Sequence, residues 1–281
     1  MKPFLGIDLT LNKKNDRVNG NEFLVQKPSS ALSESLEKLT DKADNTIEKS
    51  KLHPLLRVVQ FICSFVALLI AGAIMSALGD GLSFAQGYHN AAWLFWTTGV
   101  CAVLWLLLWL CGNHKAKNIL ETDESTQTFS HLDGIAVAIY ADLAVPADAK
   151  EIDILSFFYK IKGDKIKVQE KGMQPFQYLN PEFKIFCDEE HLYLANLEGK
   201  YAFPLSSIVK IHTVKKNIRI AGWNKDEEFN KGIYKQYKLN TDNFGCIHCK
   251  QYHILEIKHQ DETYGIYFPN YELPTLETCM E

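Results

Sequence analysis

The chain has 281 residues, with 30 Lys and Arg against 34 Asp and Glu, which gives a formal net charge of −4. Hydrophobic residues make up 47% and charged residues 23%, a balance that excludes collagen-like and disordered chains. Neither polar part of the chain has the basic excess that is typical of nucleic-acid binding, so nucleic acid is not an expected partner.

Residues 1–57 form a polar N-terminal segment, and its second half predicts an amphipathic helix over residues 30–52. Apolar residues recur there at spacings of four, three, four and four, at positions Leu32, Leu36, Leu39, Ala43 and Ile47. Pro28 provides a start signal, and Pro54 interrupts the pattern. The apolar stripe can pair with a second copy, lie on another part of the chain or remain free.

Two apolar runs follow, and each is long enough to cross a membrane. Residues 58–78 and 91–112 contain no Lys, Arg, Asp or Glu. At 1.5 Å per residue each helix is roughly 31–33 Å long, which matches a hydrocarbon core of about 30 Å. A buried helix of a soluble protein is the alternative, but such helices seldom run so long without a charge. We therefore expect a transmembrane hairpin with spans at 58–78 and 91–112.

The charges around the hairpin predict its orientation. The linker at 79–90 is too short to hold a domain and has no Lys or Arg. Cations lie only on the outer flanks, at Lys49, Lys51, Arg57, Lys115 and Lys117. The positive-inside rule therefore predicts a multi-pass protein of the cell membrane with both termini in the cytoplasm.

Small residues four apart in the first span, Gly72 and Ser76, allow close approach of another helix. That helix is either the second span or the same span of a second copy. The sequence therefore leaves open a homodimer through Gly72 and Ser76.

Residues 113–281 predict a cytoplasmic domain built mostly of antiparallel strands. Short alternating runs rich in aromatic and β-branched residues predict strands at 135–141, 152–161, 165–169, 183–188, 191–196, 201–203, 208–214, 233–239, 252–259 and 263–268. A short closing helix is expected within residues 271–280. The predicted fold class is an α+β membrane protein with an N-terminal helix, a two-helix hairpin and a C-terminal β domain.

The stretch FKIFCDEEHLYLANLEGKYAFPLSSIVKI, residues 183–211, resembles the middle of bacterial pleckstrin-homology-like and GRAM-like domains. Two spans attached to such a domain also resemble a recurring plan among bacterial membrane proteins of unknown role. The resemblance implies a pleckstrin-like barrel or sandwich with a closing helix. It further implies a non-enzymatic module that binds a lipid headgroup, a peptide or a partner protein, without a cofactor.

Two basic clusters are the candidate ligand-binding residues of this domain. The first, Lys160, Lys162, Lys165 and Lys167, flanks a tight turn at Gly163. In pleckstrin domains a basic hairpin of this kind grips phosphorylated headgroups, so the resemblance implies an anion site here. The second cluster can face an anionic membrane surface and consists of Lys210, Lys215, Lys216, Arg219 and Lys225, of which Lys215, Lys216 and Arg219 are the candidate ligand-binding residues. The solvated face of an ordinary hairpin is the alternative for both clusters.

Trp223 lies among mixed charges and either anchors a partner or covers the core. Cys246 and Cys249 form the chain's C-x-x-C, a candidate half of a zinc site, but four ligands are required and the spacing supplies no second pair. Hairpin cysteines without a metal are the alternative. Seven cysteines, an odd number, indicate reduced thiols rather than a disulfide framework.

The sequence contains none of the common nucleophile-elbow, phosphate-loop, dinucleotide-binding or zinc-protease motifs. Three functions therefore remain: a membrane-anchored binding module, which we favour, a subunit of a larger complex that is recognised through its spans, and a membrane-surface enzyme of unidentified chemistry.

Overall fold

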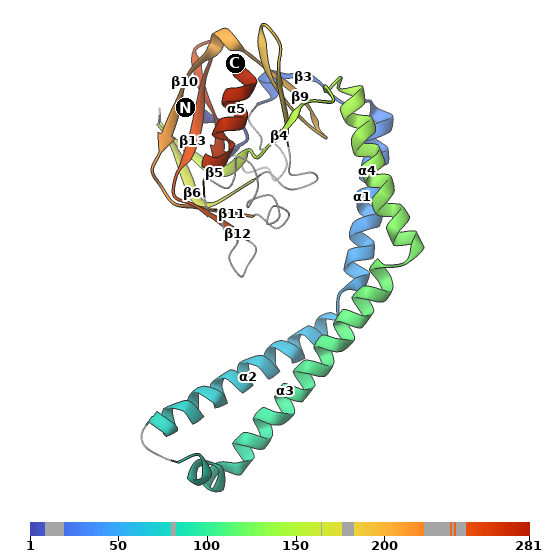
Figure 1. Cartoon of the computed structure of the whole chain (residues 1–281), viewed down its shortest axis with the longest axis vertical. Helices are drawn as coiled ribbons and strands as arrows, with labels where there is room; N and C mark the ends of the chain where they lie inside the picture. The colour runs from blue at the N-terminus through green and yellow to red at the C-terminus, as the bar shows by residue number, and fades with distance from the viewer. Residues whose placement is uncertain are drawn as a thin grey trace. The chain divides into compact units, whose positions relative to one another are not determined.

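The computed structural model describes residues 1–8, 20–79, 83–163, 165–175, 183–221, 237, 239 and 246–281. They form an α+β structure of two compact units. The β unit is Met1–Glu34 with Ile135–Glu281, and the helical unit is Ser35–Gly134. The helices are α1 (Ser30–Ser50), α2 (Pro54–Gly79), α3 (Phe84–Leu120), α4 (Asp123–Asp142) and α5 (Leu273–Met280) (Figure 1). The strands are β1 (Lys2–Pro3), β2 (Ile7–Asp8), β3 (Leu24–Gln26), β4 (Lys150–Ile152), β5 (Leu155–Lys162), β6 (Lys165–Pro175), β7 (Phe183–Cys187), β8 (His191–Asn196), β9 (Gly199–Pro204), β10 (Ile208–Val214), β11 (Ile218–Ala221), β12 (Cys246–Cys249), β13 (Tyr252–His259) and β14 (Glu262–Pro269).

The two predicted apolar spans are helical, and each is long and apolar enough to cross a membrane. Helix α2 begins at Pro54, where a proline fits because the first helical residue needs no hydrogen-bonded amide. Helix α3 is interrupted at Ala91, whose backbone angles of φ −141° and ψ 40° are not helical. Its long apolar part therefore begins where the sequence predicted the second span. Within the helical unit, α2 packs against α3.

Helix α1 confirms the predicted amphipathic helix and ends at Ser50, two residues earlier than expected. The Ser50 hydroxyl donates a hydrogen bond of 2.7 Å to the Ile47 carbonyl in the last turn. On the apolar stripe Ala43 is buried, whereas Ile47 remains 40% exposed. The stripe is thus covered only in part.

The predicted strand at 135–141 is wrong, because these residues form the last turns of α4. Alternating β-branched residues suggested the strand. In the structure, however, the buried residues Ile139 and Leu143 are four positions apart, and the side chain of Val137, two positions before Ile139, is 70% exposed. Burial every third or fourth residue is the period of a helix.

The strands form four hydrogen-bonded sheets, with the orders β1-β14-β13-β10, β3-β9-β8-β7-β4, β2-β5-β6 and β11-β12. Among the strands that the structure describes, only β1 with β14 and β2 with β5 pair in parallel; the other described pairs are antiparallel. Among the described residues no sheet closes on itself as a barrel. The fold class is therefore α+β with a mostly antiparallel β unit.

Most other strand predictions are confirmed, including the bounds of β8, β10 and β13. The closing helix is also confirmed as α5, preceded by a 3-10 turn at Asn270–Glu272. The predicted strand at 233–239 lies outside the described residues except for positions 237 and 239.

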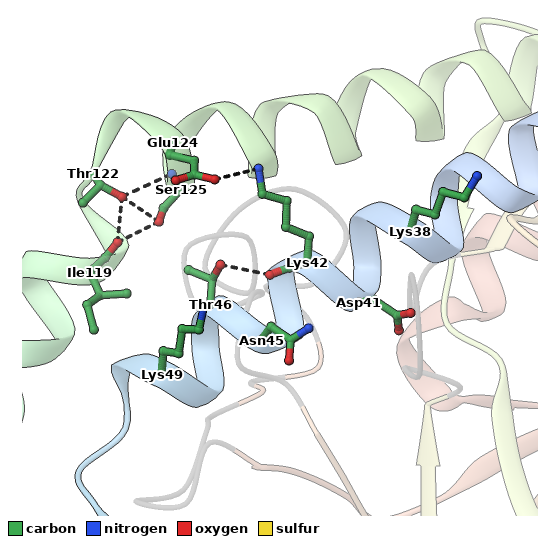
Figure 2. Close-up of a pocket in the computed structure, with 10 residues that line it drawn as sticks. All are labelled: Lys38, Asp41, Lys42, Asn45, Thr46, Lys49, Ile119, Thr122, Glu124 and Ser125. Carbon is green, nitrogen blue, oxygen red and sulfur yellow. Dashed lines mark hydrogen bonds and ion pairs between the residues drawn. The ribbon is translucent and has the colours of Figure 1, made fainter.

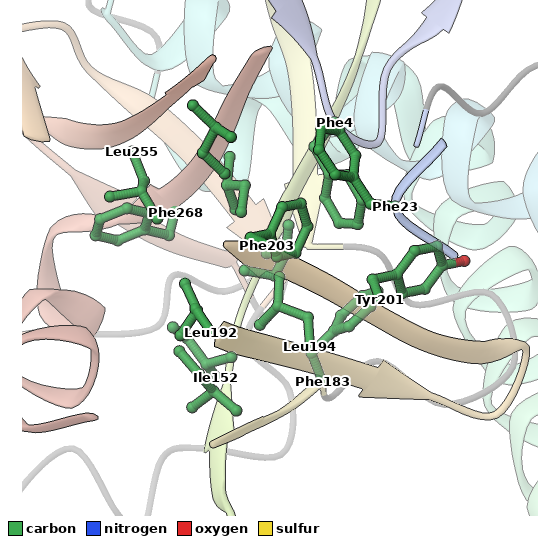
Figure 3. Close-up of a cluster of buried hydrophobic side chains, with 14 of the residues drawn as sticks. Phe4, Phe23, Ile152, Phe183, Leu192, Leu194, Tyr201, Phe203, Leu255 and Phe268 are labelled. Carbon is green, nitrogen blue, oxygen red and sulfur yellow. The ribbon is translucent and has the colours of Figure 1, made fainter. Parts of the chain in front are cut away.

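Residues from the first 34 positions of the chain contribute to the core of the β unit. Phe4 is 1% exposed and packs edge-on against Tyr201 and Phe203, with ring centroids 5.1 and 5.0 Å away. Figure 3 shows Phe4 and Phe23, from the start of the chain, next to Phe203 on β9. Perpendicular aromatic pairs of this kind add stability beyond the apolar area that they bury. The β unit is therefore assembled from both ends of the sequence.

Candidate functional site

Four of the predicted ligand-binding lysines lie on one face of the β5–β6 hairpin. In the antiparallel register Lys160 is directly opposite Lys167, and Lys162 is directly opposite Lys165. Residues two apart on a strand share a face, and so do cross-strand partners, so the four side chains project from the same side. All four are exposed.

The opposite face of the hairpin is apolar and faces the interior. Tyr159 is 2% exposed and Ile166 is half-buried. At the turn, Gly163 has φ +59°, a conformation that side-chain-bearing residues rarely adopt. The glycine therefore permits the tight turn that brings Lys162 and Lys165 into register.

The lysine face carries an electrostatic cost. Like charges directly opposite each other destabilise an antiparallel pair, and the hairpin has two such pairs in succession. Within the part of the chain that the structure describes, none of the four ammonium groups forms an ion pair with a carboxylate. A bound anion would relieve this repulsion, so the arrangement is suited to a phosphate or another multivalent oxyanion.

The second basic cluster is less uniform than the first. Lys215 and Lys216 occupy the turn between β10 and β11, and Arg219 projects outward between buried Ile218 and Ile220. Strand β11 runs beside β6. Arg219 is therefore on a strand next to the one that carries Lys165 and Lys167, and all three candidate side chains of the second cluster are exposed.

Trp223 lies outside the described residues. Cys246 and Cys249 are the first and last residues of β12. Burial raises the pKa of the Cys249 thiol to about 12, which opposes the thiolate that zinc requires. Among the described residues no group of three His, Cys, Asp or Glu is placed to hold a metal.

Sequence reasoning missed a buried polar network that joins the segment between β4 and β5 to the C-terminal end of the β unit. The Tyr271 hydroxyl donates a hydrogen bond of 2.6 Å to Asp153, whose backbone amide donates at 3.1 Å to the Glu272 carboxylate. All three residues are at most 3% exposed. Burial raises the pKa of the Tyr271 hydroxyl well above its usual value. No local signal predicts the network, because Asp153 is more than 100 positions away from Tyr271 and Glu272.

The helical unit contains a polar cleft of about 670 Å³ between α1 and the junction of α3 with α4 (Figure 2). Lys42 of α1 pairs with Glu124 of α4 at 2.9 Å and lowers the pKa of that carboxyl. Beside it the Thr122 and Ser125 hydroxyls hydrogen-bond each other at 2.8 Å. Since these lining groups partner one another, the cleft is a weaker candidate than the lysine face.

Gly72 and Ser76 on α2 are exposed. A Cβ atom at Gly72 would meet nothing within 4 Å, so α3 does not make a close approach at this glycine. The simpler explanation of the small residues, tight packing between the two spans, therefore lacks support at Gly72.

Comparison with known proteins finds no family model, no curated protein and no solved structure that matches this chain.

Proposed function

We propose that this chain is a membrane-anchored, non-enzymatic binding module. In this proposal a two-helix hairpin holds a pleckstrin-like β unit at the cytoplasmic face, where its lysine face binds an anionic lipid headgroup or another phosphorylated partner. Tethering raises the effective concentration of membrane ligands, so even a weak intrinsic affinity is sufficient.

The surface of the two apolar helices supports the membrane anchor. Large apolar side chains on α2 and α3 are exposed on several sides, among them Phe61 at 70%, Leu68 at 71% and Trp96 at 68%. A helix that is apolar all round is stable only in a protein core or in lipid. Since almost none of either apolar stretch is buried within the chain, lipid is the environment that fits.

The flanking cations support the orientation. Lys51 and Arg57 come just before the apolar run at 58–78, and Lys115 and Lys117 come just after the run at 91–112. Because the residues between the spans contain no Lys or Arg, the positive-inside rule places both ends of the hairpin in the cytoplasm. The β unit would then lie next to the anionic inner leaflet.

The register of β5 and β6 is the observation that carries the proposed ligand. It places two Lys–Lys pairs on one exposed face at an electrostatic cost, and an anionic surface would offset that cost. Near such a surface each cation contributes about 1 kcal/mol, so four contribute roughly 4 kcal/mol.

Lysine footprinting of the full chain tests this proposal. The protein is reconstituted in nanodiscs made of neutral lipid or of neutral lipid with an anionic phospholipid, and amine acetylation is followed by mass spectrometry. We expect slower acetylation of Lys160, Lys162, Lys165 and Lys167 in the anionic discs. The protection should weaken at 1 M salt, where the Debye length falls to about 3 Å.

Lys258 on β13 is the internal control, because it is an exposed lysine outside both clusters. Equal acetylation of the four hairpin lysines in both kinds of disc would refute the anionic lipid ligand. Protection of Lys258 to the same extent would also refute it, because it would indicate nonspecific contact with the membrane.

The second candidate is a subunit that is recognised through its spans, including a homodimer through Gly72 and Ser76. The open space around Gly72 favours it, because a second helix can approach there without displacing α3. Disulfide crosslinking of Ser76→Cys in native membranes tests this arrangement; the absence of a dimer crosslink would count against it.

A further inference from the structure

Two cysteines that are far apart in the sequence meet in the β unit. Cys187 is the last residue of β7, and Cys279 lies in the last turn of α5. Their Sγ atoms are 2.9 Å apart, although the residues are separated by 92 positions. Both side chains are half-buried and pack against the main hydrophobic core.

The core, rather than a loop, holds the two sulfur atoms near each other. Strand β7 is hydrogen-bonded on both sides, to β8 and to β4, and Cys187 is in register with Leu192. Helix α5 packs against β7 and is anchored by Leu276, which is 2% exposed in the same core. The pair is therefore a stable feature of the fold.

The distance between the two Sγ atoms is only slightly longer than a disulfide bond. A disulfide has an S–S length of about 2.05 Å, so a movement of roughly 0.9 Å would be required from the present 2.9 Å. A rotation about the Cα–Cβ bonds of both cysteines, together with a small shift of α5 against β7, would close this distance.

We propose that Cys187 and Cys279 form a reversible intramolecular disulfide that fastens α5 to β7, with a low-molecular-weight disulfide, R–S–S–R, as the oxidant. First, the Cys279 thiolate attacks one sulfur of R–S–S–R, forms a mixed disulfide and releases R–S⁻. The Cys187 thiolate then attacks Sγ of Cys279, forms the Cys187–Cys279 bond and releases the second R–S⁻. The two cysteines lose two electrons and two protons, and the oxidant becomes two R–SH.

The surroundings assign these two roles. Burial raises the pKa of both thiols, which keeps them mostly protonated and slow to react. At Cys279 the hydrogen bond with Cys187 and the positive charge of Lys150 both lower the thiol pKa, against the effect of burial, and so favour its thiolate. Cys279 is therefore the attacking thiol and Cys187 the resolving one. The pair changes state only when the oxidant accumulates, which makes it a redox latch.

Thiol counting on the full chain tests the latch. The protein, purified in detergent, is equilibrated with reduced or oxidised glutathione, denatured, alkylated and analysed by mass spectrometry. Of the seven cysteines, all seven should be alkylated after reduction and five after oxidation. Peptide mapping should identify a Cys187–Cys279 crosslink that dithiothreitol removes. A count of seven after oxidation, glutathione retained on either cysteine, or a disulfide between two other cysteines would overturn the proposal.

Thermal unfolding of the same samples separates a latch from a chance crosslink. Closing a long loop lowers the entropy of the unfolded chain, so oxidation should raise the melting temperature of the β unit by roughly 5–10 °C. Cys279→Ser and Cys187→Ser should abolish this shift, whereas Cys111→Ser, at an exposed position of α3, should retain it. The same shift in all three variants would overturn the proposal.

Discussion

Replacing Phe4 with alanine tests whether the first strand of the chain is part of the β unit. Phe4 is 1% exposed and lies just after β1, where its amide donates a hydrogen bond of 2.9 Å to the Gly265 carbonyl. Its ring packs edge-on against Tyr201 and Phe203 and also contacts Phe23, with ring centroids 6.3 Å apart. Removing the ring leaves a cavity among three aromatic side chains, of which Tyr201 and Phe203 are on β9 and Phe23 is in a 3-10 turn.

The magnitude follows from these contacts. A buried Phe→Ala change lowers the free energy of unfolding by about 3–5 kcal/mol. Because aromatic pairs are lost as well, we expect a loss above the lower end of this range, at about 4 kcal/mol. Domains are stable by only about 5–15 kcal/mol, so the loss is a large fraction of the total.

Pulse proteolysis of the full chain in detergent, along a urea gradient, measures the effect on the β unit. With a slope of about 2 kcal/mol per molar urea, a loss of about 4 kcal/mol lowers the midpoint by about 2 M. Val25→Ala on β3 is the matched control, because this apolar side chain from the same segment is 58% exposed and should change stability by less than about 0.5 kcal/mol. A midpoint for Phe4→Ala as close to wild type as that of the control would refute the pairing of the N-terminal segment with the β unit.

Three further outcomes are expected. Gly20→Ala should lower the stability of the β unit by about 1–3 kcal/mol in the same assay, because Gly20 has φ +130° and a Cβ atom there would lie 2.7 Å from the Phe4 ring. The control Gly134→Ala should leave that stability unchanged, because Gly134 is in an open position of α4. Replacing Lys162 and Lys165 together with glutamine should raise the urea midpoint in low salt by the equivalent of about 0.2–1 kcal/mol, because it removes a like-charge pair, and an unchanged or lower midpoint would contradict the repulsion. Burial lowers the pKa of His253 below its usual 6.5, so below pH 6.5 the unfolded chain binds a proton that the folded chain excludes. The stability of the β unit should therefore fall as the pH drops below 6.5. In thermal melts at several pH values, His253→Gln should weaken this dependence.

Several elements of this protein were predictable because their signals are local. The 3.6-residue spacing from Leu32 onward predicted α1, and uncharged runs longer than 20 residues predicted the two apolar helices. Alternation between turn residues predicted β8, β10 and β13 to the residue. The four lysines could be proposed as a site, since two strands and a glycine turn place them near one another whatever surrounds the hairpin.

The sequence by itself therefore determined the local elements, the apolar hairpin and the position of a basic turn. Tertiary structure decided that Lys2 pairs with Tyr264 and that Cys187 meets Cys279, although the two members of each pair are far apart in the sequence. It also decided that residues 135–141 form a helix rather than a strand, because the side on which Ile139 and Leu143 are buried selects between two plausible periods. The physical reason is the same in each case: hydrophobic burial depends on which distant residues are available as partners, and a local pattern of residues does not contain that information.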